Sequence, residues 1–327
     1  MKLRILSAAD VRRLLPLARC IPAAREAMVL TSGGKAVQPI RTKIDAPNAK
    51  GLLSMMPGAL ADPPRLGIKV ISVFPGNFGT GVASHQGVVL LFDPQDGRPL
   101  AMVDGRQVTA IRTGAASAVA TDVLAGADVR TLGICGYGEQ AAAHIEALTQ
   151  VRRFDKILIW GRDADKADAF ARAQAAQTGL AVETRSAPGD LARDAEVICT
   201  TTAATEPYFR GAWLRPGMHL NVVGSSIPTT AEVDVATING ARVYADFRDS
   251  ALALGGDIRR AIEAGAEVES VLTGEVGGVI LGNVEGRRGP DDITLFKSLG
   301  MVSEDLTAAW AAFEAAQVED AGTLVDF

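Results

Sequence analysis

The stretch from Val129 to Leu148 constrains the fold more than any other part of the chain, because it has the pattern of a strand, a tight turn and a helix. Its short apolar run contains Leu132 and Ile134 and stops at Gly136. Apolar residues then recur at helical spacing as far as Leu148. The stretch therefore predicts a strand, a glycine turn and a helix in immediate succession.

The small residues of this turn have the spacing of a dinucleotide-binding turn. Gly136 permits the sharp turn, Gly138 lets a pyrophosphate approach the backbone, and Ala141 lets the helix pack close to the strand. The first N–H groups of the helix and its positive dipole end would face the phosphates. An ordinary loop before a helix is the alternative. Dinucleotide binding is favoured because strand and helix lie where the pattern requires them.

Length and charge limit the kind of protein this is. The 327 residues suggest two domains, since a domain has about 150 residues. Charged residues make up 22% and hydrophobic ones 48%, values that are ordinary for a soluble globular protein. A net charge of -5 without a dense run of Lys or Arg gives no support for a nucleic-acid or membrane surface. No signal peptide or apolar run of about 18 residues is found, so a cytoplasmic protein is expected.

Cysteine and histidine give no support for a metal site or a disulfide. The three cysteines stand far apart without CxxC or zinc-ligand spacing, so reduced thiols are predicted. Cys135 and Cys199 lie in apolar runs that predict buried positions. His85, His144 and His219 are equally scattered. His85 either lines the site or is a hydrogen-bonded residue of the first domain, and no metal is predicted.

The first third of the chain predicts a helix followed by a sheet. Polar and apolar residues alternate at helical spacing from Ser7, a potential N-cap, to about Gly33. The range 37–99 consists of short β-rich pieces between Pro, Gly and Asn residues, including a hairpin turn at 94–97. This predicts a mixed or antiparallel sheet. A helix rich in small residues then runs from about Val108 to near Gly126 and leads into the second domain.

The rest of the chain predicts a doubly wound α/β domain. Strand and helix patterns alternate from Thr131 to Asp246, which is typical of a parallel sheet with helices on both faces. After Asp246 the sequence is expected to be helical and loop-like. An amphipathic helix is predicted to begin near Ser303, and its pattern does not decide which domain it joins.

The end of the strand after the glycine turn bears on the choice of cofactor. An acidic residue there would favour NAD, whereas an arginine accommodates the 2′-phosphate of NADP. Gly161 and Arg162 lie at this point, followed by Asp163, so NADP(H) is favoured and NAD(H) is the alternative. Asp163 could instead cap the next helix, and Arg162 could be a solvated loop charge. Thr201, Thr202, Ser225 and Ser226 follow predicted strands, where α/β sheets place ligands.

Four basic residues of the first half have β-rich or turn-like neighbours: Arg41, Lys69, Arg106 and Arg112. Lys69 is the most informative, because Ile68, Val70 and Ile71 make its strand apolar. An ammonium group on such a strand is either paired or at a site, or it faces outward into solvent. Arginines suit a carboxylate ligand because they can donate two parallel hydrogen bonds.

Six segments together resemble the ornithine cyclodeaminase/μ-crystallin superfamily: RTKIDAP, LGIKVISVFPGN, SHQGVVLLFDPQDGRPLAMVDGRQVTAIRTGAASAVAT, GICGYGEQA, NVVGSSIPTTAEVD and FKSLGMVSEDL. The resemblance extends over nearly the whole chain and keeps the order of the motifs. It implies a Rossmann-type, doubly wound α/β domain over 116–301 that binds the nucleotide. It also implies a mixed α+β domain for substrate binding and dimerisation, over 1–115 plus 302–327, and a homodimer.

The resemblance also implies residue roles. Arg41, Lys69 and Arg112 would bind the substrate carboxylate, and Lys69 would lie near the reacting centre as the catalytic residue. Ser226 is added as a substrate contact. The residues expected to bind the cofactor are Arg112, Thr113, Gly136, Tyr137, Gly138, Glu139, Gln140, Gly161, Arg162, Thr201, Thr202, Val223, Gly224 and Ser225.

One departure from the family pattern bears on the reaction. Cyclodeaminases of the family carry a catalytic aspartate where this chain has Ser226. A serine is neither a carboxylate base nor a charge that could steer an amine. The resemblance therefore implies reduction of a cyclic imino acid, such as Δ1-pyrroline-2-carboxylate or its six-membered analogue, by hydride transfer to C=N. A cyclodeaminase, a hydroxyproline dehydratase, an alanine-type dehydrogenase and a nucleotide-binding protein without catalysis are the alternatives.

Overall fold

The computed structural model describes residues 2–47, 50–77 and 80–327. The chain forms two compact units: Met1–Arg112 with Met301–Phe327, and Thr113–Gly300. The sequence analysis placed the divisions after residues 115 and 301. In both accounts the chain leaves the first unit and returns to it for its last helix.

The first unit contains a mixed sheet, as predicted. Its strands follow the order β16-β1-β7-β6-β5-β4-β2, and β3 also pairs with β4. Neighbours from β4 to β7 are antiparallel, whereas β1 is parallel to β7. The bounds are β1 Lys2–Leu6, β2 Ala36–Val37, β3 Thr42–Asp45, β4 Leu52–Ala61, β5 Pro64–Val73, β6 His85–Phe92, β7 Pro99–Asp104 and β16 Thr323–Asp326.

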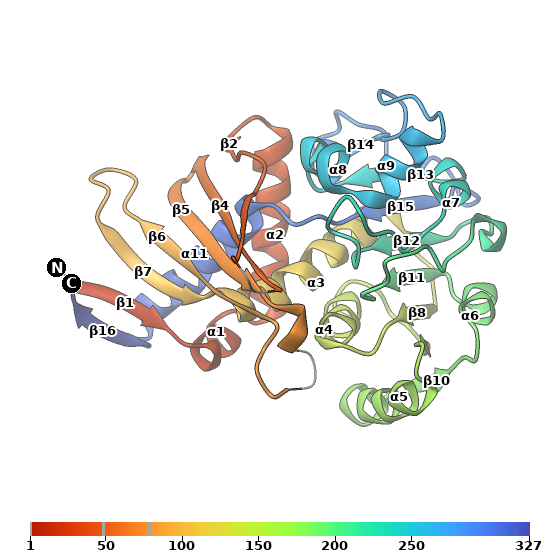
Figure 1. The fold of residues 1–327 in the computed structure, drawn as a ribbon, viewed down its shortest axis with the longest axis horizontal. Helices are drawn as coiled ribbons and strands as arrows, with labels where there is room; N and C mark the ends of the chain where they lie inside the picture. Colours follow the sequence, from red (N-terminus) through yellow and green to blue (C-terminus); the bar gives the residue numbers. More distant parts are fainter. Residues whose placement is uncertain (1, 48–49, 78–79) are drawn as a thin grey trace. The chain divides into compact units, whose positions relative to one another are not determined.

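Strands β1 and β16 were not predicted from the sequence. Lys2 pairs with Asp326 in the register of these strands, so the two ends of the chain lie side by side (Figure 1). Each strand is short, with five residues in β1 and four in β16. A local window of sequence cannot show a pairing between residues so far apart in the chain.

The predicted helix from Ser7 to Gly33 is two helices, α1 (Ala8–Leu14) and α2 (Leu17–Ser32). Ser7 caps α1 as predicted, because its hydroxyl accepts from the Asp10 N–H and the Asp10 carboxylate accepts in return. The break follows from Pro16, which disfavours helical geometry in the residue before it. A 3-10 turn, η1 (Pro75–Asn77), follows β5.

The last helix, α11 (Val302–Val318), packs against β4, β5, β6 and α2 (Figure 1). Glycines let it approach the sheet closely: a Cβ on Gly67 would lie 2.6 Å from the Leu306 side chain. Every residue of 302–309 is buried. The prediction of an amphipathic helix was wrong, because the sheet and α2 cover this helix on several sides and its first turns face no solvent.

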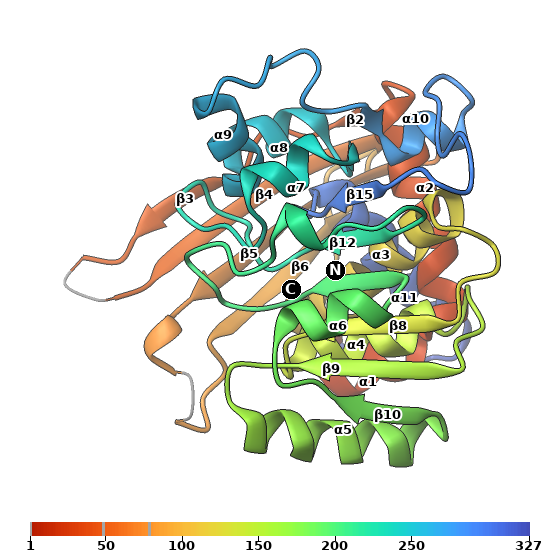
Figure 2. The ribbon, with the colours of Figure 1, turned by 90° about the vertical axis from the view of Figure 1, so that its right-hand side faces the viewer.

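The second unit contains a parallel sheet with the strand order β10-β9-β8-β11-β12-β15-β13-β14 (Figure 2). This confirms the predicted fold class. The bounds are β8 Thr131–Cys135, β9 Lys156–Trp160, β10 Ala181–Thr184, β11 Val197–Thr200, β12 His219–Val222, β13 Arg242–Ala245, β14 Gly274–Glu275 and β15 Thr294–Lys297. The helical and loop-like region expected after Asp246 in fact contains β15, which lies between β12 and β13. A four-residue strand is too short for periodicity to identify.

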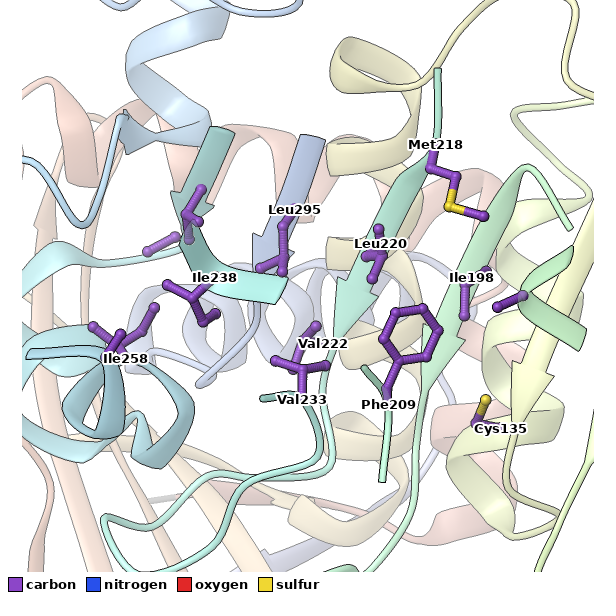
Figure 3. Packing of buried hydrophobic residues seen from close by; sticks show 14 of the residues in the cluster. Cys135, Ile198, Phe209, Met218, Leu220, Val222, Val233, Ile238, Ile258 and Leu295 are labelled. Carbon is purple, nitrogen blue, oxygen red and sulfur yellow. The ribbon is translucent and has the colours of Figure 1, made fainter. Parts of the chain in front are cut away.

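Helices cover both faces of this sheet. Leu220 and Val222 of β12 belong to a hydrophobic core that also contains Phe209 (Figure 3). Asn221 points to the opposite face, where its amide donates to the Thr121 hydroxyl on α3 at 3.0 Å. Cys135 and Cys199 are buried free thiols, as predicted. The helices are α3 Gly105–Leu124, which begins in the first unit, α4 Glu139–Leu148, α5 Ala164–Thr178, α6 Pro188–Asp194, α7 Val235–Asn239, α8 Arg248–Leu254, α9 Gly256–Glu263 and α10 Val276–Ile280, with a 3-10 turn η2 at Gly211–Trp213.

Across the part of the chain that the structure describes, no helix combines the length and the apolar character that crossing a lipid bilayer requires.

Candidate active site

A buried cluster of two cations and two carboxylates lies in the first unit. Lys69 Nζ lies 2.6 Å from Asp305 Oδ2, and Arg112 Nε donates to Asp305 Oδ1 at 2.9 Å. Arg112 Nη1 donates to Glu304 Oε2 at 2.7 Å. Lys69 is 3% exposed, Arg112 5%, and both acidic residues are fully buried. Asp305 therefore joins two of the predicted substrate-binding cations.

The local structure explains why these charges meet. Lys69 lies on β5 between the buried residues Gly67 and Ile71, on the sheet face that α11 covers. Glu304 and Asp305 occupy the first turn of α11, where the helix dipole favours carboxylates. Of the two alternatives left open for Lys69, the structure has the paired one.

Burial and charge act together on the cluster. Burial lowers the pKa of Lys69 to about 8, Asp305 opposes this change, and the charges of Arg112 and Arg41 add to it. Burial would raise the pKa of Asp305, but Arg112 and Lys69 outweigh it and bring that pKa below its usual value. Arg41 is half-buried in the same unit, and its charge acts on Lys69. The three predicted cations thus belong to one electrostatic group.

The glycine turn of the second unit has the features that a dinucleotide requires. Gly136 has φ 127°, and an added Cβ would lie 2.7 Å from the Thr201 hydroxyl, so the fold itself demands glycine there. Gly138 has φ -97°, which any residue adopts, and an added Cβ would meet nothing within 4 Å. The packing of the chain therefore gives no reason for a glycine at position 138, whereas a phosphate approaching the backbone does.

The start of α4 supplies the remaining elements of a phosphate site. Gly138 is its N-cap and provides no side-chain hydrogen bond to the first N–H groups. Gln140 Oε1 is buried and has no hydrogen-bond partner among the described residues. These groups fit the phosphates and polar edges of a nicotinamide dinucleotide. Glu139 is exposed in the first turn of the same helix.

Tyr137 has a structural role in the turn. Its ring lies directly over Gly161, where an added Cβ would overlap the ring. The glycine turn is thereby connected to the end of β9. Arg162 is exposed just beyond that strand, and Asp163 caps α5 by accepting from the Lys166 N–H at 3.1 Å. The capping alternative for Asp163 is therefore confirmed.

A single carboxylate holds the loops that follow β11 and β12. Glu232 is fully buried and accepts from the Thr200 hydroxyl at 2.7 Å, the Thr202 N–H at 2.7 Å and the Gly224 N–H at 2.6 Å. Burial raises the pKa of Glu232, and the hydrogen bonds from Thr202 and Thr200 oppose that rise. The loops with the predicted contacts Thr201, Thr202, Val223 and Gly224 are therefore fixed to each other.

A second buried network lies beside it. Lys297 Nζ lies 2.9 Å from Asp257 Oδ2 and donates to the Ser225 carbonyl at 2.6 Å. The Ser225 hydroxyl also donates to Asp257, and Asp257 Oδ1 accepts from the N–H groups of Glu232 and Val233. A cofactor contact from Ser225 would therefore come from its backbone.

Comparison with known proteins supplies the family. A sequence profile of the Ornithine cyclodeaminase/mu-crystallin family matches residues 1–320. The chain belongs to this family. Its relatives include a delta(1)-pyrroline-2-carboxylate reductase of Bacillus cereus, which is 34% identical over 324 residues and matched over 99% of both chains. The ketimine reductase mu-crystallin of Mus musculus is 36% identical over 281 residues, 86% of each protein.

A solved structure of this family is similar over its whole length. It is the delta(1)-pyrroline-2-carboxylate reductase of Thermococcus litoralis in complex with NADH and L-proline. The TM-score is 0.94 at 33% sequence identity, and the match covers 98% of this chain and 99% of that one. The likeness agrees with the predicted combination of a parallel nucleotide-binding sheet and a mixed second sheet.

The predicted site residues fall into two groups. Arg41, Lys69 and Arg112 lie in the first unit, and Thr113, the next residue of α3, is buried and is the first residue of the second unit. The residues of the glycine turn and of the strand ends lie in the second unit, where Ser226 is half-buried beside Ser225. Two further residues discussed in the sequence analysis are exposed: Arg106 on α3, and His85 on β6 with Nδ1 2.9 Å from the Ser84 hydroxyl.

The buried carboxylates were not predicted from the sequence. Glu304 and Asp305 were not singled out, because the sequence was taken to predict an amphipathic helix beginning near Ser303, although the helix after them is apolar on nearly every face. That all-round apolar character was the available signal, because it predicts burial of the whole helix. No local pattern predicts the buried networks of Glu232, Asp257 and Lys297, because these residues are far apart in the chain.

Proposed function

We propose that this protein is an NAD(P)H-dependent reductase that converts a cyclic imino acid, Δ1-pyrroline-2-carboxylate or Δ1-piperideine-2-carboxylate, to the corresponding L-amino acid. The observation that carries the proposal is the buried pair of cations Lys69 and Arg112, which Asp305 joins. Together with Arg41 they form a group of three cations against the two carboxylates Glu304 and Asp305, and a net positive group of this kind suits an anionic substrate. The related reductases named above add support.

The cations have distinct parts in the proposed mechanism. Arg41 and Arg112 bind and orient the substrate carboxylate. Lys69 lies beside Arg112 through their shared partner Asp305, and its ammonium group donates a proton to, or stabilises, the ring nitrogen as that nitrogen becomes an amine. The reduced nicotinamide supplies the hydride to the C=N carbon when it is bound. Correct placement of the substrate by these side chains accounts for several kcal/mol of barrier lowering, as an order of magnitude.

For the cofactor we favour NADP(H), on the ground that Arg162 is exposed at the end of β9 and can meet a 2′-phosphate. The structure of the Thermococcus reductase contains NADH, so NAD(H) is the alternative. Comparing KM for NADPH and NADH, in the native protein and in Arg162→Ala, decides between them. A selective rise in the KM for NADPH is expected in the variant.

The function is tested with purified protein, NADPH and Δ1-pyrroline-2-carboxylate. We expect oxidation of the cofactor, seen as loss of its near-ultraviolet absorbance, together with formation of proline. Absence of both, where a known reductase is active, would exclude the proposal. Release of ammonia from ornithine, or of water from hydroxyproline, without net cofactor oxidation would indicate one of the lyases of the family instead.

We also propose that the protein is a homodimer that uses the sheet face opposite α11. Pro57, Ile68, Leu90 and Met102 are register partners across β4 to β7, and none of the four is fully buried. Leu53 is 39% exposed and Leu66 38%. A contiguous apolar surface of this kind marks an interaction site. Ile68→Asp should convert a dimer to a monomer in sedimentation analysis, and an unchanged mass would exclude this face.

A further inference from the structure

Two adjacent carboxylates of α11 have different partners. Asp305 contacts both Lys69 and Arg112, through one oxygen each, whereas Glu304 forms an ion pair with Arg112. Both acids are fully buried in the same helical turn. Their difference lies therefore in which cation they contact, and not in their exposure or their secondary structure.

The surroundings of Lys69 make Asp305 its only acidic contact among the described residues. From α11 it faces Asp305, from α3 the like charge of Arg112, and from the segment before β3 the like charge of Arg41. Its partners on β4 and β6 are Met56 and Val89, which are apolar. Cys20 of α2 lies near Arg112 and Glu304, and burial raises its pKa to about 12, so it carries no charge there.

We propose that Asp305 is a positioning residue of the reductase: it holds the Lys69 ammonium and the Arg112 guanidinium at one point and keeps the lysine charged at neutral pH. The inference rests on the proposed function for its catalytic meaning. Asp305 touches neither the substrate nor the cofactor in this account and acts through the two cations.

The electrostatic consequence is a shift of the alkaline limit of activity. With Asp305 present, the pKa of Lys69 is about 8. Removal of the negative charge leaves burial and two like charges to act on the ammonium, so the pKa falls further. An opposite charge at this distance is worth about one to three pH units. In Asp305→Asn, kcat/KM should therefore decline at a pH lower by about one unit or more.

Glu304→Gln is the matched control, because it changes the neighbouring carboxylate without touching Lys69. It should raise KM for the imino acid through Arg112 and leave the alkaline limit where it is. Lys69→Arg is the second variant: it should turn over more slowly because the proton donor is lost, but an arginine stays charged throughout, so the alkaline limit of its residual activity should disappear. Ionisations of the substrate are common to all these proteins and cancel in the comparison.

The test measures kcat/KM against pH for the native protein and the three variants. A decline at lower pH in Asp305→Asn, but not in Glu304→Gln, supports the inference. A loss of activity by the same factor at every pH would show that Asp305 is merely structural, and would overturn it. If Asp305→Asn does not fold, Asp305→Glu takes its place: this variant keeps the negative charge, so an unchanged alkaline limit supports the inference and a lowered one overturns it.

A measurement without substrate separates this inference from the proposed function. Protein labelled with ¹³C-lysine is titrated by NMR, and the Lys69 resonance is assigned through Lys69→Arg. The midpoint should be near pH 8 in the native protein and lower in Asp305→Asn. Equal midpoints overturn the role of Asp305 even if the protein is an active reductase. A lowered midpoint in a protein that reduces no imine supports that role and rejects the function.

Discussion

Asp305 of the first unit and Glu232 of the second are both buried carboxylates, but they have different kinds of partner. In the first unit, Asp305 and Glu304 contact the side chains of cations. In the second, Glu232 accepts from hydroxyl and backbone N–H groups that belong to two separate loops. Asp305 and Glu304 therefore affect the charge of Lys69 and Arg112, whereas Glu232 fixes the conformation of the loops that follow β11 and β12.

The difference predicts which property a mutation of each carboxylate should change. A carboxylate that balances cations alters their protonation and the binding of anions when it is removed. A carboxylate that holds backbone N–H groups leaves buried donors without acceptors when it is removed, which lowers stability. Removal of Asp305 should therefore mainly change activity, and removal of Glu232 should mainly change stability.

The largest effect is expected for Lys69→Met. Loss of the ammonium group removes both charge and a proton donor, and kcat should fall by about 10²- to 10⁴-fold. Binding of the cofactor, measured by fluorescence titration of NADPH, should persist because the predicted cofactor loops lie in the other unit. Retention of native turnover would show that Lys69 has no catalytic part.

Glu232→Ala should mainly affect stability. It leaves the Thr202 N–H and the hydroxyls of Thr200 and Thr202 without the Glu232 oxygens that accept from them, which costs about 3 kcal/mol in the free energy of unfolding. The expected fall in melting temperature is about 6 to 12 °C. Glu206→Gln, which removes an exposed ion pair with Arg260, is the control and should melt at the native temperature. Equal melting of both variants would refute the role given to Glu232.

The two glycines of the turn should respond in opposite ways. Gly138→Ala should melt like the native protein, since its Cβ meets nothing, but should raise the KM for the cofactor by about tenfold or more through lost phosphate hydrogen bonds. Gly136→Ala should unfold at a lower temperature, because φ 127° and Thr201 exclude a side chain. Native cofactor affinity in Gly138→Ala would argue against a phosphate at this position.

The smallest effect at neutral pH is expected from His144, because its contribution to stability changes only as the pH falls. Buried His144 donates from Nδ1 to the Gln140 carbonyl and lies beside the Ser117 hydroxyl, and burial lowers its pKa to about 4. The unfolded chain binds a proton near pH 6.5, so stability falls as pH drops from about 6.5 to about 4 and falls no further below that.

His144→Gln tests this dependence. Between pH 6.5 and 4, the free energy of unfolding should decrease less steeply in the variant than in the native protein, by about 1.4 kcal/mol per pH unit. Urea unfolding at a series of pH values measures this slope. Above pH 7, where the histidine is neutral in both states, the variant should show the same slope as the native protein. Parallel slopes down to pH 4 would mean that His144 is charged in the folded state.

Local patterns predicted much of the fold. Thr131–Cys135 and Glu139–Leu148 have the predicted types and positions, because a strand, a glycine turn and a helix of ordinary length are specified by neighbouring residues. The short strands β1, β15 and β16 were missed, because their stability comes from partners distant in the chain. The substrate cations Arg41, Lys69 and Arg112 were predicted from their apolar or turn-like surroundings and the family resemblance, and they remain proposed site residues.

By itself the sequence determined the kind of structure: a parallel α/β unit with a glycine turn, a mixed sheet, and basic residues where the pattern is otherwise apolar. Only the tertiary structure decided which acids meet which bases. Glu304 and Asp305 look like ordinary first-turn residues until α11 is placed against β5, which buries them with Lys69 and Arg112. The reason is physical: helix and strand patterns depend on near neighbours, whereas burial and charge pairing depend on the residues that folding brings from elsewhere in the chain.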